Sequence, residues 1–226
     1  MRQPSESGYA ACVKTPEQPP HDCQLCPRLA AFRADNRARY PDWFNAPVPS
    51  FGPVTARLLI AGLAPGLQGA NRTGRPFTGD WAGDLLYATL LKHGLARGTY
   101  EERADDSLEL VDCRIANSVR CVPPQNKPEP SEIKTCRRFL KSELETLPNV
   151  KVILALGKIA HDSVCDALGA RKALHPFKHG MAYGKLGKFT LISSYHCSRY
   201  NTNTGVLTTK MFENVVAKAK ALAAIA

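Results

Sequence analysis

The sequence predicts an α/β fold in which a four-stranded parallel sheet is flanked by helices on both faces. Short apolar runs alternate with longer stretches of helical periodicity, an order typical of parallel sheets. The first run, Leu58 to Leu63, is apolar throughout, as in strands buried on both faces. The predicted strands are 57–63, 112–117, 150–156 and 189–195, and the predicted helices are 80–93, 130–146, 157–168 and 206–224.

Residues at the ends of the predicted helices support these assignments. Asp80 is a suitable N-cap for the first helix, because its carboxylate can accept a hydrogen bond from an unpaired backbone N–H. Gly94 is a suitable stop, and Pro130 suits the first turn of the second helix. A further helix is expected after Pro27, ending near Tyr40.

The chain of 226 residues divides into a tail and a single domain. Residues 1–20 are polar and rich in proline, which predicts a disordered or loosely packed tail. Residues 21–226 are expected to form one α/β domain, within which the proline-rich segment 41–53 is extended.

Composition indicates a globular protein with an anionic partner. Apolar residues make up 44% and charged residues 22% of the chain, and the formal net charge is +10. No apolar stretch approaches the roughly 20 residues of a membrane span, and the N-terminus lacks the apolar core of a signal peptide. We therefore expect a cytoplasmic protein. The positive charge alone leaves open whether the partner is a nucleic acid, because a basic chain need not bind one.

Eight cysteines are many for a reducing compartment, where disulfides seldom persist, and they direct attention to metal ligation. Cys23 and Cys26 form a C-x2-C pair, and Cys121 and Cys136 follow far downstream. Four thiolates can hold a structural zinc ion or an iron–sulfur cluster, and spacing alone slightly favours zinc. The set could also be unrelated core cysteines. The remaining four suit small buried residues or tail thiols: Cys12, Cys113, Cys165 and Cys197.

Three loops are expected to share one edge of the sheet, because ligands of parallel sheets bind beyond the carboxyl ends of the strands. These loops are 64–79, 118–130 and 196–204. The first is unusually long for a strand-to-helix connection and rich in glycine, and it carries Phe77. Glycine allows close backbone approach, and an aromatic ring offers a stacking surface for a base.

Two polar residues end predicted strands at this edge. Asn117 could pair with the N3–H and O4 of uracil, or with the similar edge of hypoxanthine, but it could equally satisfy strand-end backbone. His196 could donate to a developing anion, or serve a structural role. A thiol–imidazole pair with Cys197 is disfavoured, since neighbouring residues of an extended chain face opposite sides.

Basic residues in the three loops and beyond could contact phosphates: Arg72, Arg75, Lys127, Arg199 and Lys210. The loop 64–79 lacks both the P-loop spacing and the G-x-G-x-x-G pattern. A nucleotide-processing enzyme is therefore a weaker interpretation than a protein that binds a polynucleotide.

Three segments resemble the motifs of family 5 uracil-DNA glycosylases. Residues 62–66 (GLAPG) together with 69–80 (GANRTGRPFTGD) are similar to the first motif. Residues 117–124 (NSVRCVPP) are similar to the second motif, and 196–202 (HCSRYNT) to the third. Cys23, Cys26, Cys121 and Cys136 match the ligand pattern of the family's 4Fe–4S cluster. The resemblance covers roughly residues 20–210 and now favours the cluster over zinc.

The resemblance implies a uracil-DNA glycosylase-like fold and hydrolysis of the N-glycosidic bond of deaminated bases in DNA, after the base has flipped out of the duplex. By motif position, Phe77 would stack on the base, Asn117 would read its edge and His196 would stabilise the departing base anion. The segment 198–204, with Arg199, Tyr200 and Asn201, would enter or contact the DNA.

This sequence departs from the family pattern twice in the third motif, and one departure is that Arg199 and Tyr200 stand where the family often has glutamines. Cys197 stands where the family usually has proline, which frees a backbone N–H beside His196. The related family 4 enzymes carry a carboxylate where this chain has Leu63, so the group that acts on water is open. Asn71 could position the water, and Asp80 is the alternative.

The sequence therefore predicts a monomeric, cytoplasmic, nucleoid-associated repair glycosylase that binds DNA and no membrane. No lysine nucleophile is evident in the loops, so hydrolysis without strand cleavage is expected. Leu63 and Ala64 add no polar discrimination to the base site, which predicts that hypoxanthine or xanthine is also accepted. The alternative is a non-catalytic DNA-binding protein with a four-cysteine metal site.

Overall fold

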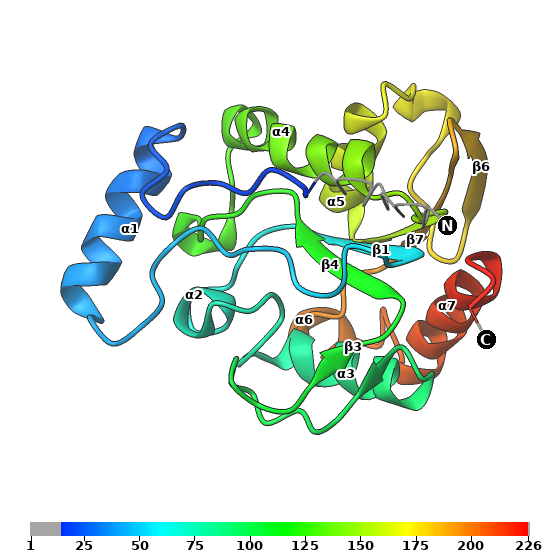
Figure 1. The fold of residues 1–226 in the computed structure, drawn as a ribbon, viewed down its shortest axis with the longest axis horizontal. Coiled ribbons are helices and arrows are strands. Elements are labelled where there is room, and N and C mark those ends of the chain that lie inside the picture. The colour runs from blue at the N-terminus through cyan, green and yellow to red at the C-terminus, as the bar shows by residue number, and fades with distance from the viewer. Residues whose placement is uncertain (1–14, 226) are drawn as a thin grey trace, which may run out of the picture.

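The computed structural model, which describes residues 15–225, has a five-stranded sheet in the order β4-β1-β5-β7-β6 (Figure 1). The four predicted strands are present and pair in parallel. Their observed bounds are β1 Leu58–Gly62, β4 Cys113–Asn117, β5 Val152–Leu156 and β7 Phe189–Ser194. The α/β class with a mainly parallel sheet is therefore confirmed.

The fifth strand, β6 (Ala182–Leu186), was not predicted and pairs antiparallel with β7 at the edge of the sheet. Its sequence contains Gly184 and Lys185, and only Leu186 of the strand is buried. An exposed edge strand needs no continuous apolar run, so hydrophobic patterning alone gives it little signal.

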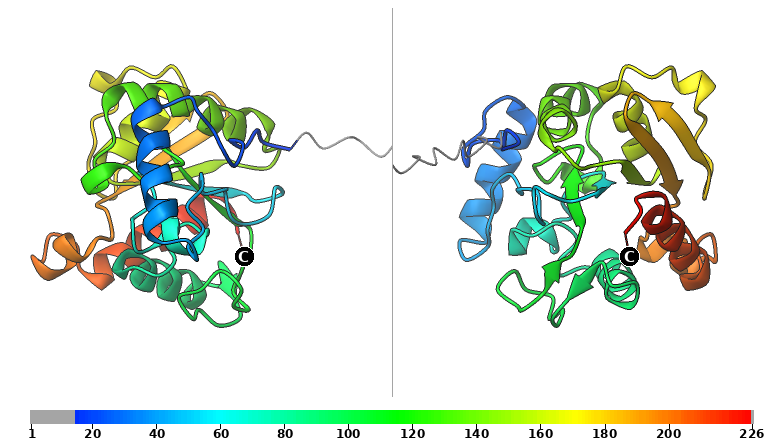
Figure 2. Two further views of the ribbon diagram at one scale, coloured as in Figure 1. Left: turned by 90° about the vertical axis from the view of Figure 1, so that its left-hand side faces the viewer. Right: turned by 45° about the vertical axis from the view of Figure 1, so that its right-hand side comes forward.

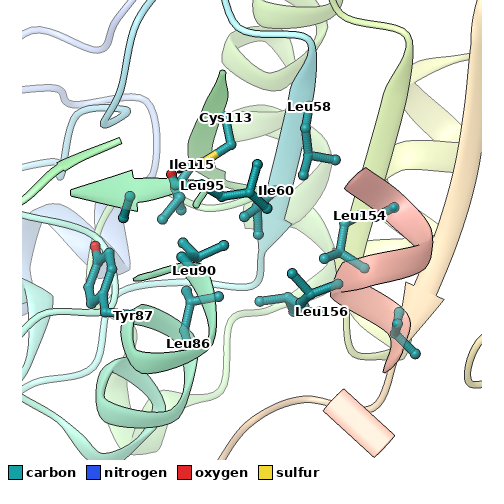
Figure 3. Close-up of a cluster of buried hydrophobic side chains, with 14 of the residues drawn as sticks. Leu58, Ile60, Leu86, Tyr87, Leu90, Leu95, Cys113, Ile115, Leu154 and Leu156 are labelled. Atoms are coloured by element: carbon teal, nitrogen blue, oxygen red, sulfur yellow. Dashed lines mark hydrogen bonds between the residues drawn. The ribbon is translucent and has the colours of Figure 1, made fainter. Parts of the chain in front are cut away.

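Helices cover both faces of the sheet because neighbouring residues of each strand point to opposite sides. On one face Leu58 and Ile60 pack against α3 (Trp81–Lys92) and α7 (Thr209–Leu222), as Figure 3 shows in part. On the other face Leu59 and Ala61 pack with side chains of α4 (Pro130–Thr146) and α5 (Lys158–Ala167).

The remaining elements are short, apart from the N-terminal helix. They are α1 Pro27–Arg39, α2 Ala70–Thr73, α6 Arg199–Asn203, the 3-10 turns Pro124–Asn126 and Lys172–Leu174, and the strands β2 Ala96–Arg97 and β3 Glu109–Leu110. The helix predicted over 206–224 begins later, because the side chain of Thr208 caps it by accepting from Met211 N. No helix within residues 15–225 has both the length and the apolarity to cross a membrane.

Most of the predicted tail, residues 1–14, lies outside the described residues. Its last residues are packed rather than loose: Pro16 is buried, and Gln18 Nε2 donates to Glu143 Oε1 at 2.9 Å. The folded part of the chain therefore begins before the expected boundary at residue 21.

Candidate active site

The loops that follow β1, β4 and β7 enclose a cavity of about 380 Å³ at the carboxyl ends of the strands. The expectation that these three loops share one edge is thus confirmed. Residues from all three line the cavity, together with the start of α3: Leu63, Ala64, Pro65, Gly66, Ala70, Phe77, Asp80, Trp81, Ala82, Asn117, Asn126, His196, Ser198 and Arg199.

Phe77, Asn117 and His196 lie together in this cavity. The rings of Phe77 and His196 are stacked with centroids 6.0 Å apart and an interplanar angle of 30°. Asn117 is 3% exposed, and its Oδ1 has no hydrogen-bond partner within the described chain. An aromatic surface, an amide with free hydrogen-bonding capacity and an imidazole therefore meet at one place.

Gly62, at the end of β1, makes this arrangement possible. A Cβ at this position would lie 2.3 Å from Asn117 Oδ1 and 2.7 Å from Phe77 Cζ. The side chains of Asn117 and Phe77 thus pack directly onto the backbone of Gly62. Phe77 itself has φ of 53°, in the left-handed region that residues other than glycine seldom adopt, so the loop holds its ring at a conformational cost.

Burial lowers the pKa of His196 to about 4, so its imidazole is neutral at physiological pH. A neutral imidazole can donate one hydrogen bond and accept another. Cys197 is fully buried in the core on the α3 and α7 side of the sheet, whereas His196 lines the cavity. The exclusion of a thiol–imidazole pair therefore agrees with the structure.

Asp80 is the N-cap of α3 and also lines the cavity. Its Oδ1 accepts from Gly83 N at 3.2 Å, as predicted for an N-cap. Its Oδ2 lies against Gly69, where a Cβ would approach to 2.3 Å. Burial raises the pKa of Asp80, while backbone N–H groups at the start of α3 partly oppose the rise. A carboxylate of raised pKa is a suitable acceptor for a proton.

Asn71 does not reach the cavity. It is 1% exposed, its Nδ2 donates to Asn45 Oδ1 at 2.8 Å, and it is not among the lining residues. The expectation that Asn71 positions a water is therefore not supported by its place in the fold. Of the two candidates for this role, Asp80 alone faces the cavity.

Arg75 was predicted to contact DNA, and this prediction is wrong. Its side chain is 4% exposed and forms two hydrogen bonds of 2.6 and 2.7 Å with the carboxylate of Asp106. Burial alone would raise the pKa of Asp106, but the bonds from Arg75 and from backbone N–H groups lower it to about 2. The pair holds the loop in place, and Arg75 is not available to a phosphate.

The other basic candidates are exposed: Arg72, Lys127, Arg199 and Lys210. Arg199 also lines the cavity and lies over the ring of Trp81, with its guanidinium carbon 5.5 Å from the ring centroid. Trp81 is 48% exposed and was missed by sequence reasoning, which treated it as part of a helix. Its place directly after the cap Asp80, at the loop edge, was the available signal.

The segment after His196 forms α6 and carries Tyr200 outward, where it is 74% exposed. Asn201, predicted to bind DNA, is partly exposed, and its Nδ2 donates to the backbone carbonyl of His196 at 2.8 Å. Asn201 therefore anchors the backbone of His196.

The four predicted ligand cysteines line one small cavity beside α1: Cys23, Cys26, Cys121 and Cys136. Arg33 Nη1 donates to Cys121 Sγ at 3.4 Å, and Arg120 N donates to Cys136 Sγ at 3.3 Å. Such donors stabilise negative charge on sulfur. Burial raises the pKa of Cys121 to about 11 and of Cys136 to about 12, so both are thiols unless a metal replaces their protons.

Within residues 15–225, no three His, Cys, Asp or Glu side chains are arranged to hold a metal ion. The other cysteines within the described residues are buried, as expected for small core residues: Cys113, Cys165 and Cys197. Cys12 lies outside the described part of the chain.

Comparison with known proteins agrees with this arrangement. The family model of the uracil DNA glycosylase superfamily matches residues 49–220. The chain is 47% identical to a type-5 uracil-DNA glycosylase of Thermus thermophilus, over 90% of this chain and 94% of that protein. It is 38% identical to a type-5 enzyme of Pyrobaculum aerophilum, over 88% of each chain. It is 39% identical to one of Mycobacterium tuberculosis, over 90% of this chain and 79% of that protein. The chain belongs to the uracil DNA glycosylase superfamily.

Proposed function

We propose that this protein is a uracil-DNA glycosylase, a hydrolase that removes uracil from DNA by cleaving its N-glycosidic bond. The observation that carries the proposal is the meeting of Phe77, Asn117 and His196 in one cavity at the carboxyl edge of the sheet. The names of the type-5 relatives support the same activity.

Base binding requires the nucleotide to leave the duplex, at a cost of a few kcal/mol. Stacking on Phe77 offsets part of this cost, typically ~1–3 kcal/mol per base. Asn117 can accept from the N3–H of uracil and donate to O4, whereas cytosine presents the opposite pattern at these positions. Its buried Oδ1, unpartnered among the described residues, leaves capacity for this pairing.

Bond cleavage moves the electron pair of the bond between the sugar carbon and the base nitrogen onto the base. The neutral imidazole of His196 donates to the developing anion and lowers its energy. Water then bonds to the oxocarbenium-like sugar carbon, and the carboxylate of Asp80 takes up the proton that this water loses. No lysine is among the residues that line the cavity, which favours hydrolysis without strand cleavage.

The base site is expected to accept hypoxanthine and xanthine as well. Leu63 and Ala64 line the cavity without adding a polar group that would reject a purine. The test is release of each free base from duplexes that carry uracil, hypoxanthine or xanthine. Release of uracil alone would contradict the broad range but not the glycosylase activity.

A 4Fe–4S cluster is the cofactor proposed for Cys23, Cys26, Cys121 and Cys136. The four thiols surround one cavity, and their donors from Arg33 and Arg120 N suit thiolate ligands. A cluster is held by four cysteine thiolates, the number that this cavity offers. It would join the segment before α1 to the loop after β4 and take no part in bond cleavage.

Purified protein tests this assignment directly. A cluster predicts a brown protein that contains iron and sulfide, and Cys121→Ser should lose both. A colourless protein that contains zinc would contradict it.

DNA binding is assigned to the exposed cations Arg72, Lys127 and Arg199, which would contact phosphates. Tyr200 is placed to fill the gap left by the flipped base. The enzyme would act as a monomer and, because its substrate is chromosomal DNA, at the nucleoid.

The deciding experiment incubates the protein with a uracil-containing duplex and measures free uracil in a single turnover. The wild-type protein should release uracil, and His196→Ala should slow release by about 10²- to 10³-fold while DNA binding is retained. His21→Ala is a matched control, since His21 is exposed and lies outside the cavity. DNA binding without base release would refute the proposal and favour a non-catalytic DNA-binding protein.

A further inference from the structure

The helix α6 carries Tyr200 but has little packing of its own. It contains five residues, Arg199–Asn203, and none of them is buried. It projects from the body of the molecule (the orange helix in the left view of Figure 2). A helix of this length is not stable alone, so its position depends on contacts with other elements.

Two side-chain contacts of Trp81 tie α6 to the start of α3. Trp81 Nε1 donates to Thr202 Oγ1 at 2.9 Å, and Arg199 lies over the indole ring at 5.5 Å from its centroid. The hydrogen bond fixes the orientation of the indole, and the cation–π contact holds a second residue of α6 on its face. The two contacts together define where α6 lies relative to α3.

The two helices differ in how firmly they are held. α3 packs Leu86 and Leu90 into the core against the sheet, whereas α6 is exposed. Trp81 therefore fixes the position of the weakly held α6 relative to the firmly packed α3. The second anchor, from Asn201 to the carbonyl of His196, ties α6 to the base site at its other side.

We infer that Trp81 is a positioning residue for base eversion, because it holds α6 so that Tyr200 can enter the space left by the flipped nucleotide. This inference rests on the proposed glycosylase function. It adds that the contact between Trp81 and Thr202 matters for extracting the base and not for cleaving the bond.

The inference predicts a dependence on base pairing that a general structural role would not produce. A base in a stable pair is costly to extract, a mismatched base is less costly, and a single strand requires no opening of a pair. Weakening the support of Tyr200 should therefore slow uracil release most from a U·A duplex, less from a U·G duplex and least from single-stranded DNA.

Two conservative variants remove the contact from opposite sides. Trp81→Phe keeps an aromatic ring near Arg199 but loses the N–H, and Thr202→Val keeps the shape of the side chain but loses the hydroxyl. Each should slow single-turnover release from the U·A duplex by roughly two- to tenfold, the range for one lost hydrogen bond. The double variant should be no slower than the slower single variant, because both remove the same bond.

Thr209→Val is the matched control, since Thr209 is exposed at the start of α7 and outside the cavity. Equal losses on all three substrates, or no loss on the U·A duplex, would overturn the inference while leaving the glycosylase activity intact. Failure of the wild-type protein to release uracil even from single-stranded DNA would instead refute the proposed function. Should one variant fail to fold, the other carries the test.

Discussion

Two carboxylates, the half-buried Asp80 and the buried Glu143, have opposite surroundings. Asp80 lies at the cavity, where its partners are backbone N–H groups and burial raises its pKa. Glu143 is fully buried between Arg114, at 2.7 Å, and Arg120, at 3.5 Å, and also accepts from Ser50 Oγ. Burial alone would raise the pKa of Glu143, but the bond from Arg114 and the charges of both arginines lower it.

The difference in surroundings indicates a structural role for Glu143 and a chemical role for Asp80. The charge of Glu143 is matched by arginines, so its proton affinity is low and its role is to join β4, α4 and the segment near Gln18. Asp80 has no cationic partner among its interactions, and it faces the space where a ligand would bind. A carboxylate that is partly desolvated and has no cationic partner, at the edge of a cavity, is typical of a functional site.

The sharpest test of this contrast is Asp80→Asn. Asparagine can still cap α3, so the fold should be retained, but it cannot accept a proton. Single-turnover uracil release should fall by about 10²- to 10⁴-fold at neutral pH. A fall of less than twofold would contradict the role of Asp80.

The pH profile of the wild-type enzyme tests the same carboxylate. Because the pKa of Asp80 is raised, the rate should decline on acidification at a higher pH than the ordinary aspartate value, as the carboxylate becomes protonated. His196 has a pKa of about 4 and should not change charge between about pH 5 and 8. An inflection near the ordinary histidine value that is lost in His196→Ala would contradict this account.

For Glu143, we expect a loss of stability and not of chemistry. Glu143→Gln leaves Arg114 and Arg120 buried without a carboxylate, which should lower the free energy of unfolding by about 3–5 kcal/mol. Urea denaturation measures this change. Glu145→Gln is the matched control, because Glu145 forms an exposed pair with Lys141. A slow but fully stable Glu143→Gln enzyme would contradict the distinction between the two carboxylates.

Phe77→Ala should have an intermediate effect confined to the cavity. Loss of the stacking surface should weaken transition-state binding by ~1–3 kcal/mol, seen as a lower kcat/KM for uracil release. Phe77→Tyr keeps the ring and should retain most of the activity. Equal activity of the alanine variant and the wild type would remove Phe77 from the base site.

The smallest effect is expected at the exposed cations. Arg72→Ala should weaken DNA binding and reduce the slope of log affinity against log salt by about 1, the value for one lost phosphate contact. Binding measured across a salt series checks this value. An unchanged slope would show that Arg72 makes no phosphate contact.

The fold was largely predictable because parallel strands buried on both faces leave continuous apolar runs. Whether the side chains of the loops are exposed or paired was harder to predict. Arg72 and Arg75 lie three residues apart in the same glycine-rich loop, yet one is exposed and the other pairs with Asp106. That pairing depends on a residue 31 positions away, which local sequence does not reveal.

The location of the candidate site could be predicted, because it lies at the carboxyl ends of the parallel strands. Asn117 ends β4 and His196 follows β7, whereas Phe77 lies in the long loop between β1 and α3, and the topology brings the three together. Asn71 and Asn201 have the same polar character, but the Nδ2 of Asn71 donates to Asn45 and that of Asn201 to the carbonyl of His196. A side chain that hydrogen-bonds within the protein and one that faces a ligand are alike in sequence and differ only in tertiary structure.

The most direct measurement is the structure of the protein bound to a duplex that carries a non-hydrolysable deoxyuridine analogue. We predict that the uracil ring lies in the cavity, stacked on Phe77, with its N3–H and O4 against Asn117 and His196 within hydrogen-bonding distance of the base. A uracil that remains stacked in the duplex, or that binds away from these three side chains, would contradict the account.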